Sequence, residues 1–558
     1  MSALTLFLAA TPTPSASASP HATNFGAGVF NFSFLLSLLI WTPVLVAAVM
    51  AVLPNPRGRW DRQFRLTAFW TSLALLVLSM VAYSQFQPYA STLSFEESQP
   101  WLPALGVTYH LGLDGINTAA LVLNGFIGLV AVVASPGVRV RARSYWVLLL
   151  LTEAAVNGAV EAQDFFLFAL FWSAMIVPLG LLIRGWGGPG ARQAASRLVV
   201  HWGVGSACLL AAGIGLWAGT GAVSFNFNTM LAATAGDRAQ VVIGLLVLVA
   251  AASRLALFPF HRWAPPALAE APPGVAVLIA GSGMRLGGYL LLRLLAQTNQ
   301  HGAELLAPLL AAMAAATVIW AALMAFGTGD IRRLSAWLAI IPGGFTALGV
   351  AGLSPLSLEG AVLSLFAGGL AAALVVGAAA TLSERAQSRQ LGVVAGLAAR
   401  MPRISWLLLL ASLTILGLPF AATFPADVMI VLGSVRNQPV GVFGALLGLL
   451  LAAAAIAWLI HRVLFGAPRP EAPTPSDSSL AESWYLGILV GALLWVGVFP
   501  LGPRLGGIPL FDPGMLNVIN ATIPTMAGAY VVPTPPPAPI PASPSPSPSA
   551  APSPSPSP

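Results

Sequence analysis

The uncharged stretch AVLSLFAGGLAAALVVGAAATL, residues 361–382, decides the fold class of this chain. It lies within an apolar segment, 357–383, that is long enough to cross a bilayer, since a helix needs about 20 apolar residues for that. Segments of the same kind recur from residue 33 to residue 503. The sequence therefore predicts an all-α polytopic membrane protein with about fourteen transmembrane helices.

The composition of the chain excludes most soluble functions. Of 558 residues, 57% are hydrophobic and 8% are charged, whereas a soluble globular protein carries about 25% charged residues. The single cysteine, Cys208, excludes a disulfide framework, a cysteine zinc site and an iron–sulfur cluster held by this chain alone. Neither a phosphate loop nor a GxGxxG motif after a strand is present, so no nucleotide site is expected.

The two ends differ in composition from the helical region. The first residues carry a short apolar run without a preceding basic segment, which predicts a flexible leader. From Val532 the chain is a Pro/Ser repeat, which is typical of an extended, solvated tail. The predicted organisation is a leader (1–32), three helices (33–144), a first five-helix repeat (145–296), a second five-helix repeat (305–465), a last helix (481–503) and a tail (504–558).

The basic residues predict the orientation of the helices. All 25 are arginines, and they gather in alternate connections. The first such connection holds Arg57, Arg59, Arg62 and Arg65. The intervening connections hold only Arg238, Arg293 and Arg436. The predicted location is the cell membrane. By the positive-inside rule, the arginine-rich connections are cytoplasmic and both termini are extracytoplasmic. Arginines scattered over many connections do not form a face for nucleic acid.

Four charged residues fall deep inside the predicted spans, away from the span ends, where charge is costly and usually functional. They are Glu153, Arg254, Arg285 and Asp427. The alternative for Glu153 is a helix-packing role, and the alternative for the arginines is snorkelling to the surface. At 1.5 Å per residue the arginines lie roughly 10 and 16 Å from their nearer span ends, which favours internal ion pairs with Glu153 or Asp427.

Three further polar residues lie nearer to span ends. His201 is interpreted chiefly as a polar packing residue. His261 follows a proline, and structural and functional roles are equally compatible with its position. Asp330 is a candidate for either a relay or a structural role.

Prolines interrupt two of the spans. Pro259 falls in the seventh span, and Pro419 with Pro425 in the twelfth. Proline removes a backbone hydrogen bond, and broken helices at corresponding positions of two repeats mark the ion path in transporters. The breaks lie five spans apart, which favours two five-helix units, although ordinary proline kinks are the alternative.

Six motifs in order along the chain carry a family resemblance. They are YHLGLDGIN (109–117), DFFLFALFW (164–172), LFPFHRWAPPALAEAP (257–272), MRLGGYLLLR (284–293), GDIRRLSAW (329–337) and LGLP (416–419). Together they resemble the antiporter-like membrane subunits of respiratory complex I, and the LGGY form resembles the M-type subunit, also called chain 4. The resemblance covers about residues 105–435 and implies fourteen helices with two inverted five-helix repeats.

The resemblance also implies a function and its partners. It implies a line of protonatable groups along the membrane midplane, driven by quinone reduction elsewhere in a large complex. The partners would be other membrane subunits and the lipid bilayer. No cofactor is expected on this chain, and quinone, flavin and iron–sulfur clusters are expected in partner subunits.

The charged residues match family positions one by one. Glu153 matches a glutamate of the fourth span, and Asp427 takes the acidic position of the twelfth. Arg254 and Arg285 stand at two family lysine positions. Unlike lysine, arginine stays charged and cannot release its proton.

Three other relay positions depart from the family. Ser173 stands where the family has the key glutamate of the fifth span, and Pro342 and about Gly368 stand where it has histidines. One hypothesis is therefore a proton-translocating subunit of a complex I-like NADH:quinone oxidoreductase with an altered relay. The alternatives are a degenerate, non-pumping structural subunit of such a complex, or a subunit of a multisubunit cation/proton antiporter or a membrane hydrogenase.

Overall fold

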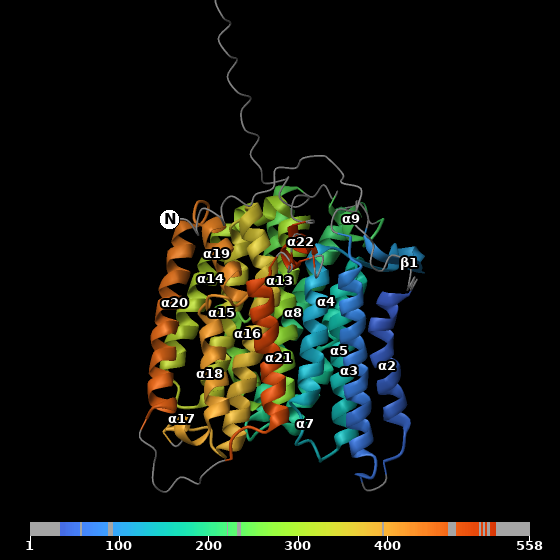
Figure 1. Cartoon of the computed structure of the whole chain (residues 1–558). Helices are drawn as coiled ribbons and strands as arrows, with labels where there is room; N and C mark the ends of the chain where they lie inside the picture. Colours follow the sequence, from blue (N-terminus) through green and yellow to red (C-terminus); the bar gives the residue numbers. More distant parts are fainter. Residues whose placement is uncertain are drawn as a thin grey trace, which may run out of the picture.

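The computed structural model shows a bundle of long helices standing side by side (Figure 1). It describes residues 34–55, 58–87, 93–219, 221, 223–231, 236–392, 396–466, 476–500, 504–505, 508–509 and 514–520. The predicted leader, 1–32, and the part of the predicted tail beyond residue 520 lie outside the described residues.

The first half of the chain forms a series of helices and one β-hairpin. The elements are α2 (Leu35–Val52), α3 (Asp61–Ser84), β1 (Ser94–Leu102), β2 (Val107–Leu113), α4 (Gly115–Val133), α5 (Ala142–Glu161), α6 (Phe165–Ala174), α7 (Ile176–Trp186), α8 (Ala191–Gly219), α9 (Phe227–Leu231), α10 (Asp237–Leu255), η3 (Phe260–Trp263), α11 (Ala264–Glu270), α12 (Pro273–Leu278), η4 (Ile279–Gly283), α13 (Arg285–Leu290) and η5 (Leu291–Thr298). A short turn, η2 (Pro103–Leu105), joins the antiparallel strands β1 and β2.

The second half is almost entirely helical. Its elements are α14 (Gln300–Gly327), α15 (Ile331–Ala351), α16 (Pro355–Arg385), α17 (Leu397–Arg400), α18 (Pro402–Ile415), α19 (Thr423–Ser434), α20 (Pro439–Leu459), η6 (Ile460–Leu464), α21 (Leu480–Val498), β3 (Arg504–Leu505), β4 (Ile508–Pro509) and α22 (Met515–Asn520). Helix α22 packs on α4 and α16. Residues 515–520, assigned from sequence to the tail, are therefore part of the folded bundle.

Twelve of the described helical segments are long and apolar enough to cross a membrane. The stretch quoted first, 361–382, lies in one of them, α16. The chain is thus a multi-pass, mostly helical membrane protein, as predicted. Helix α5 and the shorter pair α18 and α19 stand in the same bundle (Figure 1). The count of fourteen and the two inverted repeats, 145–296 and 305–465, stay predictions.

Burial separates central from peripheral helices. The most apolar windows of Pro273–Thr298, α15 and α16 are 100% buried, whereas those of α2, α3 and α8 are 39% buried and that of α21 is 28% buried. Apolar side chains on the peripheral helices face outward, which suits contact with lipid. Any charge on the central helices is therefore surrounded by protein rather than by lipid.

The arginine-rich connections meet at one end of the bundle. Ion pairs join Arg389 to Glu270 at 3.2 Å and Arg385 to Glu482 at 2.7 Å, and Arg141 donates to the Gly185 carbonyl. The hairpin strand β1 and the short helices α9 and α22 lie at the opposite end (Figure 1). The alternation of arginines along the sequence thus corresponds to the two ends of the fold.

Both predicted helix breaks are present, although not every proline causes one. Helix α10 ends at Leu255, Ala256 takes a left-handed conformation (φ 57°), and regular α-helix resumes at Ala264. The second break runs from the end of α18 to Thr423 and includes Pro419. Pro425 does not interrupt a helix: it lies in the first turn of α19, where a missing backbone N–H costs little.

Candidate functional site

Arg254 lies in the last turn of α10, directly before the first break, and is fully buried. Its guanidinium carbon lies 4.1 Å from the centre of the Trp172 ring and 3.8 Å from that of the Trp202 ring. The same group donates a hydrogen bond to the backbone carbonyl of Trp172. We call Trp172 and Trp202 the tryptophan cage.

The predicted ion pair of Arg254 with a carboxylate is wrong. None of the ion pairs among the described residues includes Arg254. The carbonyl that it meets belongs to the residue before Ser173, where the resemblance expects a glutamate. Aromatic faces attract a desolvated cation, so the cage and this carbonyl hold the positive charge without a carboxylate.

Glu153 lies on α5, against α3 and α4. One carboxylate oxygen accepts a hydrogen bond from Ser72 Oγ at 2.7 Å, and the other has no partner among the described residues. A methyl group on Gly128 of α4 would collide with this carboxylate, so the glycine provides the space for it. Glu153 is therefore a buried carboxyl group without a counter-cation among the described residues.

Arg285 begins α13 in the centre of the bundle. Its guanidinium donates to the Ala339 carbonyl at 3.3 Å, while Nε and Nη1 have no partner among the described residues. A Cβ on Gly368 would lie 3.6 Å from Nη1 and 2.7 Å from the Pro342 ring. The arginine thus lies beside the positions where the resemblance expects histidines. The expected ion pair is again absent from the described residues.

Asp427 lies on α19, just after the second break, and is half-buried. A Cβ on Gly417, which has a left-handed φ of 71°, would lie 3.2 Å from its Oδ2. The structure does not bring Asp427 together with Glu153, Arg254 or Arg285 through any described hydrogen bond or ion pair.

A buried ion pair forms where the sequence analysis did not expect one. Arg293, counted above among the residues of an external connection, lies in the span at η5 with 3% exposure and pairs with Asp114 at 2.5 Å. Asp114 also caps α4 through the backbone N–H groups of Ile116 and Asn117. The pair therefore joins YHLGLDGIN to MRLGGYLLLR, two of the motifs that carry the resemblance.

The remaining predicted polar residues have mainly structural surroundings. His261 stacks on Phe258, with ring centres 5.5 Å apart, and its Nδ1 has no partner among the described residues. The ring of His201 bonds to the Arg197 carbonyl one turn earlier. Asp330 caps α15 by accepting from two backbone N–H groups.

Sequence reasoning missed three buried polar residues near Glu153. They are Asn124 on α4 and Asn157 and Glu161 on α5. The signal was present in the spacing, because Glu153, Asn157 and Glu161 recur every four residues and so share one helix face. Depth within a span, taken residue by residue, does not show this spacing.

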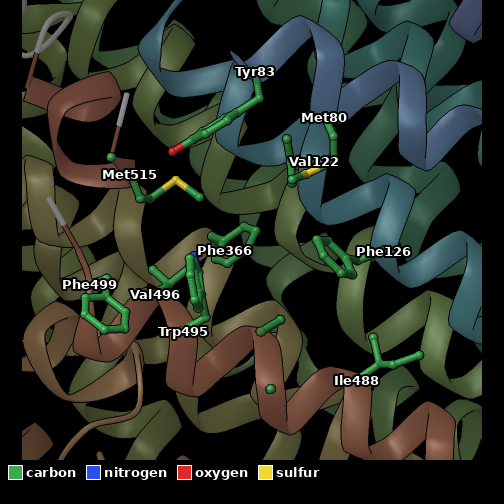
Figure 2. Close-up of a pocket in the computed structure, with 13 residues that line it drawn as sticks. Met80, Tyr83, Val122, Phe126, Phe366, Ile488, Trp495, Val496, Phe499 and Met515 are labelled. Atoms are coloured by element: carbon green, nitrogen blue, oxygen red, sulfur yellow. The ribbon is translucent and has the colours of Figure 1, made fainter. Parts of the chain in front are cut away.

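An apolar cavity of about 220 Å³ lies between α3, α4, α16, α21 and α22 (Figure 2). Its lining includes Phe126, Phe366, Trp495 and Met515 and no charged side chain. The cavity is therefore apolar and is not part of the surroundings of the buried charges. The described residues contain no group of three or more potential metal ligands.

Comparisons with known proteins identify the family of this chain and several similar proteins. Residues 162–452 match the family described as "NADH:quinone oxidoreductase/Mrp antiporter, TM". The chain is 30% identical over 447 residues to an NAD(P)H-quinone oxidoreductase chain 4 of Thermosynechococcus vestitus, covering 77% of this chain and 82% of the relative. It is 28% identical over 505 residues to the F(420)H(2) dehydrogenase subunit M of Methanosarcina mazei, covering 88% and 98%. A chain of respiratory complex I from Thermus thermophilus superposes with a TM-score of 0.77 and 26% identity, over 88% of this chain and 99% of that one.

Proposed function

Because the chain belongs to the NADH:quinone oxidoreductase/Mrp antiporter family, we propose that it is a proton-translocating membrane subunit of a complex I-like NADH:quinone oxidoreductase with an altered proton relay. The observation that carries the proposal is the placement of a charged residue beside each of the two helix breaks, fully buried at the first and half-buried at the second. Arg254 precedes the first break and Asp427 follows the second. Charges inside a membrane protein are costly and are usually retained for transport.

The relay is altered because its cations cannot carry protons. Arg254 and Arg285 keep their charge at every physiological pH, since an arginine is not deprotonated in proteins. They supply fixed positive potential, while the carboxyl groups of Glu153 and Asp427 remain as groups that can bind and release a proton. Transport in this chain then depends on carboxyl groups and on water between them.

Assembly, cofactors and topology belong to the same proposal. The chain works in the cell membrane beside other hydrophobic subunits, and quinone, flavin and iron–sulfur clusters are held by partner subunits rather than by this chain. Both termini lie outside, and the end that carries the arginine-rich connections faces the cytoplasm. The similarity to subunits of larger complexes supports the assembly with other membrane subunits.

A non-pumping structural subunit is the second candidate. The observation that favours it is the tryptophan cage, which holds Arg254 in place without a titratable partner. The absence of the family's glutamate at Ser173 favours it as well. A subunit of a multisubunit cation/proton antiporter or a membrane hydrogenase is a further alternative within the same fold.

Proton flux in vesicles that contain the whole purified complex tests the proposal. The number of protons moved per quinone reduced is measured for the native complex and for complexes with Glu153→Gln or Asp427→Asn. We expect each substitution to lower the proton yield without loss of this subunit from the complex. Native proton yield in both variants would establish the structural alternative instead.

A further inference from the structure

The polar face of α5 is unusual for a buried helix. Glu153, Asn157 and Glu161 follow one another at intervals of four residues and are 0%, 2% and 0% exposed. At 1.5 Å per residue the two glutamates are separated by about 12 Å along the helix axis. From this arrangement we propose that α5 carries a proton path from Glu153 to the hairpin end of the bundle, through Glu161 and Glu97. This inference rests on the proposed function and assigns it a route.

The inner end of the path is the Glu153 carboxyl group. Only one of its oxygens is hydrogen-bonded, to Ser72 Oγ, and no described cation pairs with it. A buried carboxylate without a counter-charge is so costly that the group normally takes up a proton instead. The unpartnered oxygen therefore provides a place for a proton or for a water molecule.

Two asparagines continue the path beside this carboxyl group. The Asn124 amide donates to Asn157 Oδ1 at 2.6 Å and to the Glu153 backbone carbonyl at 3.2 Å. The Asn157 amide donates to the Leu39 carbonyl of α2 at 3.0 Å. Asn124 Oδ1 is buried and without a partner among the described residues. An amide both donates and accepts, so this pair can hold water between the two glutamates.

Glu161 is the strongest sign of function on this face. Both of its carboxylate oxygens are buried and have no hydrogen-bond partner among the described residues. A glutamate kept only for packing would be expected to satisfy these oxygens, because an unmade buried hydrogen bond costs about 1–3 kcal/mol. The group therefore needs a proton, a water molecule or both.

The hairpin leads from Glu161 to the surface. In the hairpin, Leu111 of β2 pairs with Glu97 of β1 on one side and with Ala162, the residue after Glu161, on the other. Two strand spacings place these flanking backbones about 10 Å apart, so a proton passing between the two carboxyl groups needs water here as well. Glu97 is 9% exposed, and its neighbour Glu96 is exposed.

Tyr109 lies within electrostatic reach of both carboxyl groups. Burial raises the pKa of its hydroxyl, hydrogen bonds with Ser37 and Trp41 lower it, and the charges of Glu97 and Glu161 both raise it. Glu97 in turn accepts from the Leu36 and Ser37 backbone N–H groups at the start of α2. The outermost carboxyl group is thus fixed in position at the end of the bundle.

Each step along this path is a proton transfer between oxygen atoms. A carboxylic acid gives its proton to a neighbouring water, one O–H bond breaks and another forms, and the carboxylate regains a proton from the other side. Water is the co-reactant, because 12 Å is too long for direct transfer between carboxyl groups at hydrogen-bond distances of about 3 Å. No net change remains on the protein after a proton has passed.

Glu161→Gln in the whole complex, reconstituted in vesicles, tests the path. Glutamine keeps the size and polarity of the side chain but cannot carry a proton. We expect Glu161→Gln to lose the same part of the proton yield that Glu153→Gln loses, and Glu161→Asp to retain it. Glu304→Gln on α14 is the matched control, because that glutamate is exposed, and it should leave the yield unchanged.

The outcomes separate this inference from the proposed function. A native proton yield in Glu161→Gln, with a lowered yield in Glu153→Gln, overturns the path and leaves the proposed function standing. A native yield in both Glu153→Gln and Asp427→Asn overturns the proposed function, and the path with it. If Glu161→Gln fails to assemble, Asn157→Leu carries the test, because it removes the amide and keeps both carboxyl groups.

An infrared measurement gives an independent readout. The native complex should show the C=O stretch of a protonated, buried carboxylic acid that is missing in Glu161→Gln. Identical spectra in this region would show that Glu161 is never protonated, and the path would be refuted whatever the flux.

Discussion

Replacing Trp202 by leucine should destabilise the fold in part by weakening the cage around Arg254. The indole face lies 3.8 Å from the guanidinium carbon, and both groups are fully buried. A desolvated cation–π contact contributes about 2 kcal/mol, which corresponds to roughly a 30-fold change in an equilibrium constant. The substitution also removes part of a large buried side chain, so the cation–π contribution has to be isolated by a control.

Trp146→Leu is that control. Trp146 is likewise 0% exposed and makes one edge-to-face contact, with ring centres 5.0 Å apart, while Trp202 makes one with Trp263 at 5.1 Å. None of the described cation–π contacts involves Trp146. The two substitutions therefore delete the same atoms from similar surroundings, and their difference reports the arginine.

The assay is the free energy of unfolding in mixed micelles, followed by circular dichroism during titration with a denaturing detergent. We expect Trp202→Leu to cost about 2 kcal/mol more than Trp146→Leu. In an Arg254→Met background this excess should disappear, as in a double-mutant cycle. Equal losses for the two tryptophans, or an excess that persists without the arginine, would refute the cation–π account.

Three further predictions follow from the same geometry. Cysteines introduced by Ser543→Cys and Arg141→Cys, in a background without the native cysteine, should be labelled from opposite sides of the membrane, and cytoplasmic labelling of Ser543→Cys would reverse the topology. Glu153→Gln and Arg254→Gln should have additive effects on the free energy of unfolding, within about 0.5 kcal/mol, because the two side chains are not paired. If the double variant is more stable in a detergent titration than either single variant, the ion-pair hypothesis is restored. Gly128→Ala should destabilise the fold by about 1–3 kcal/mol, since the added methyl group collides with the Glu153 carboxylate, and this loss, measured by the same titration, should shrink in a Glu153→Ala background.

The sequence could predict the features that depend on local chain properties. Apolar length predicted a multi-pass helical membrane protein, because the thickness of a bilayer fixes how many residues a helix needs to cross it. The break in the seventh span followed from Pro259, and the alternation of arginines anticipated the two ends of the bundle. A span or a break can be read within about twenty residues, and the alternation of arginines from the order of the connections. The tertiary structure agrees with the multi-pass fold, the break and the two ends of the bundle.

Partners of buried charges could not be predicted in this way. Spacing along the chain shows that Arg254 lies too deep to reach the surface easily, but not that two tryptophans from other helices flank it. The Arg293–Asp114 pair joins residues 179 positions apart, and hydropathy cannot report a contact at such a separation. Both the tryptophan cage and the Arg293–Asp114 pair depend on which helix faces meet.

The carboxyl groups of α5 show the boundary between the two sources of information. The four-residue spacing of Glu153, Asn157 and Glu161 is a property of the sequence alone, since any helix places such residues on one face. Whether that face meets lipid, water or protein depends on packing. Only the tertiary structure places it against α2, α3 and α4, buried and without counter-cations in the part of the chain that the structure describes, because burial results from the assembly of many helices and not from any one of them.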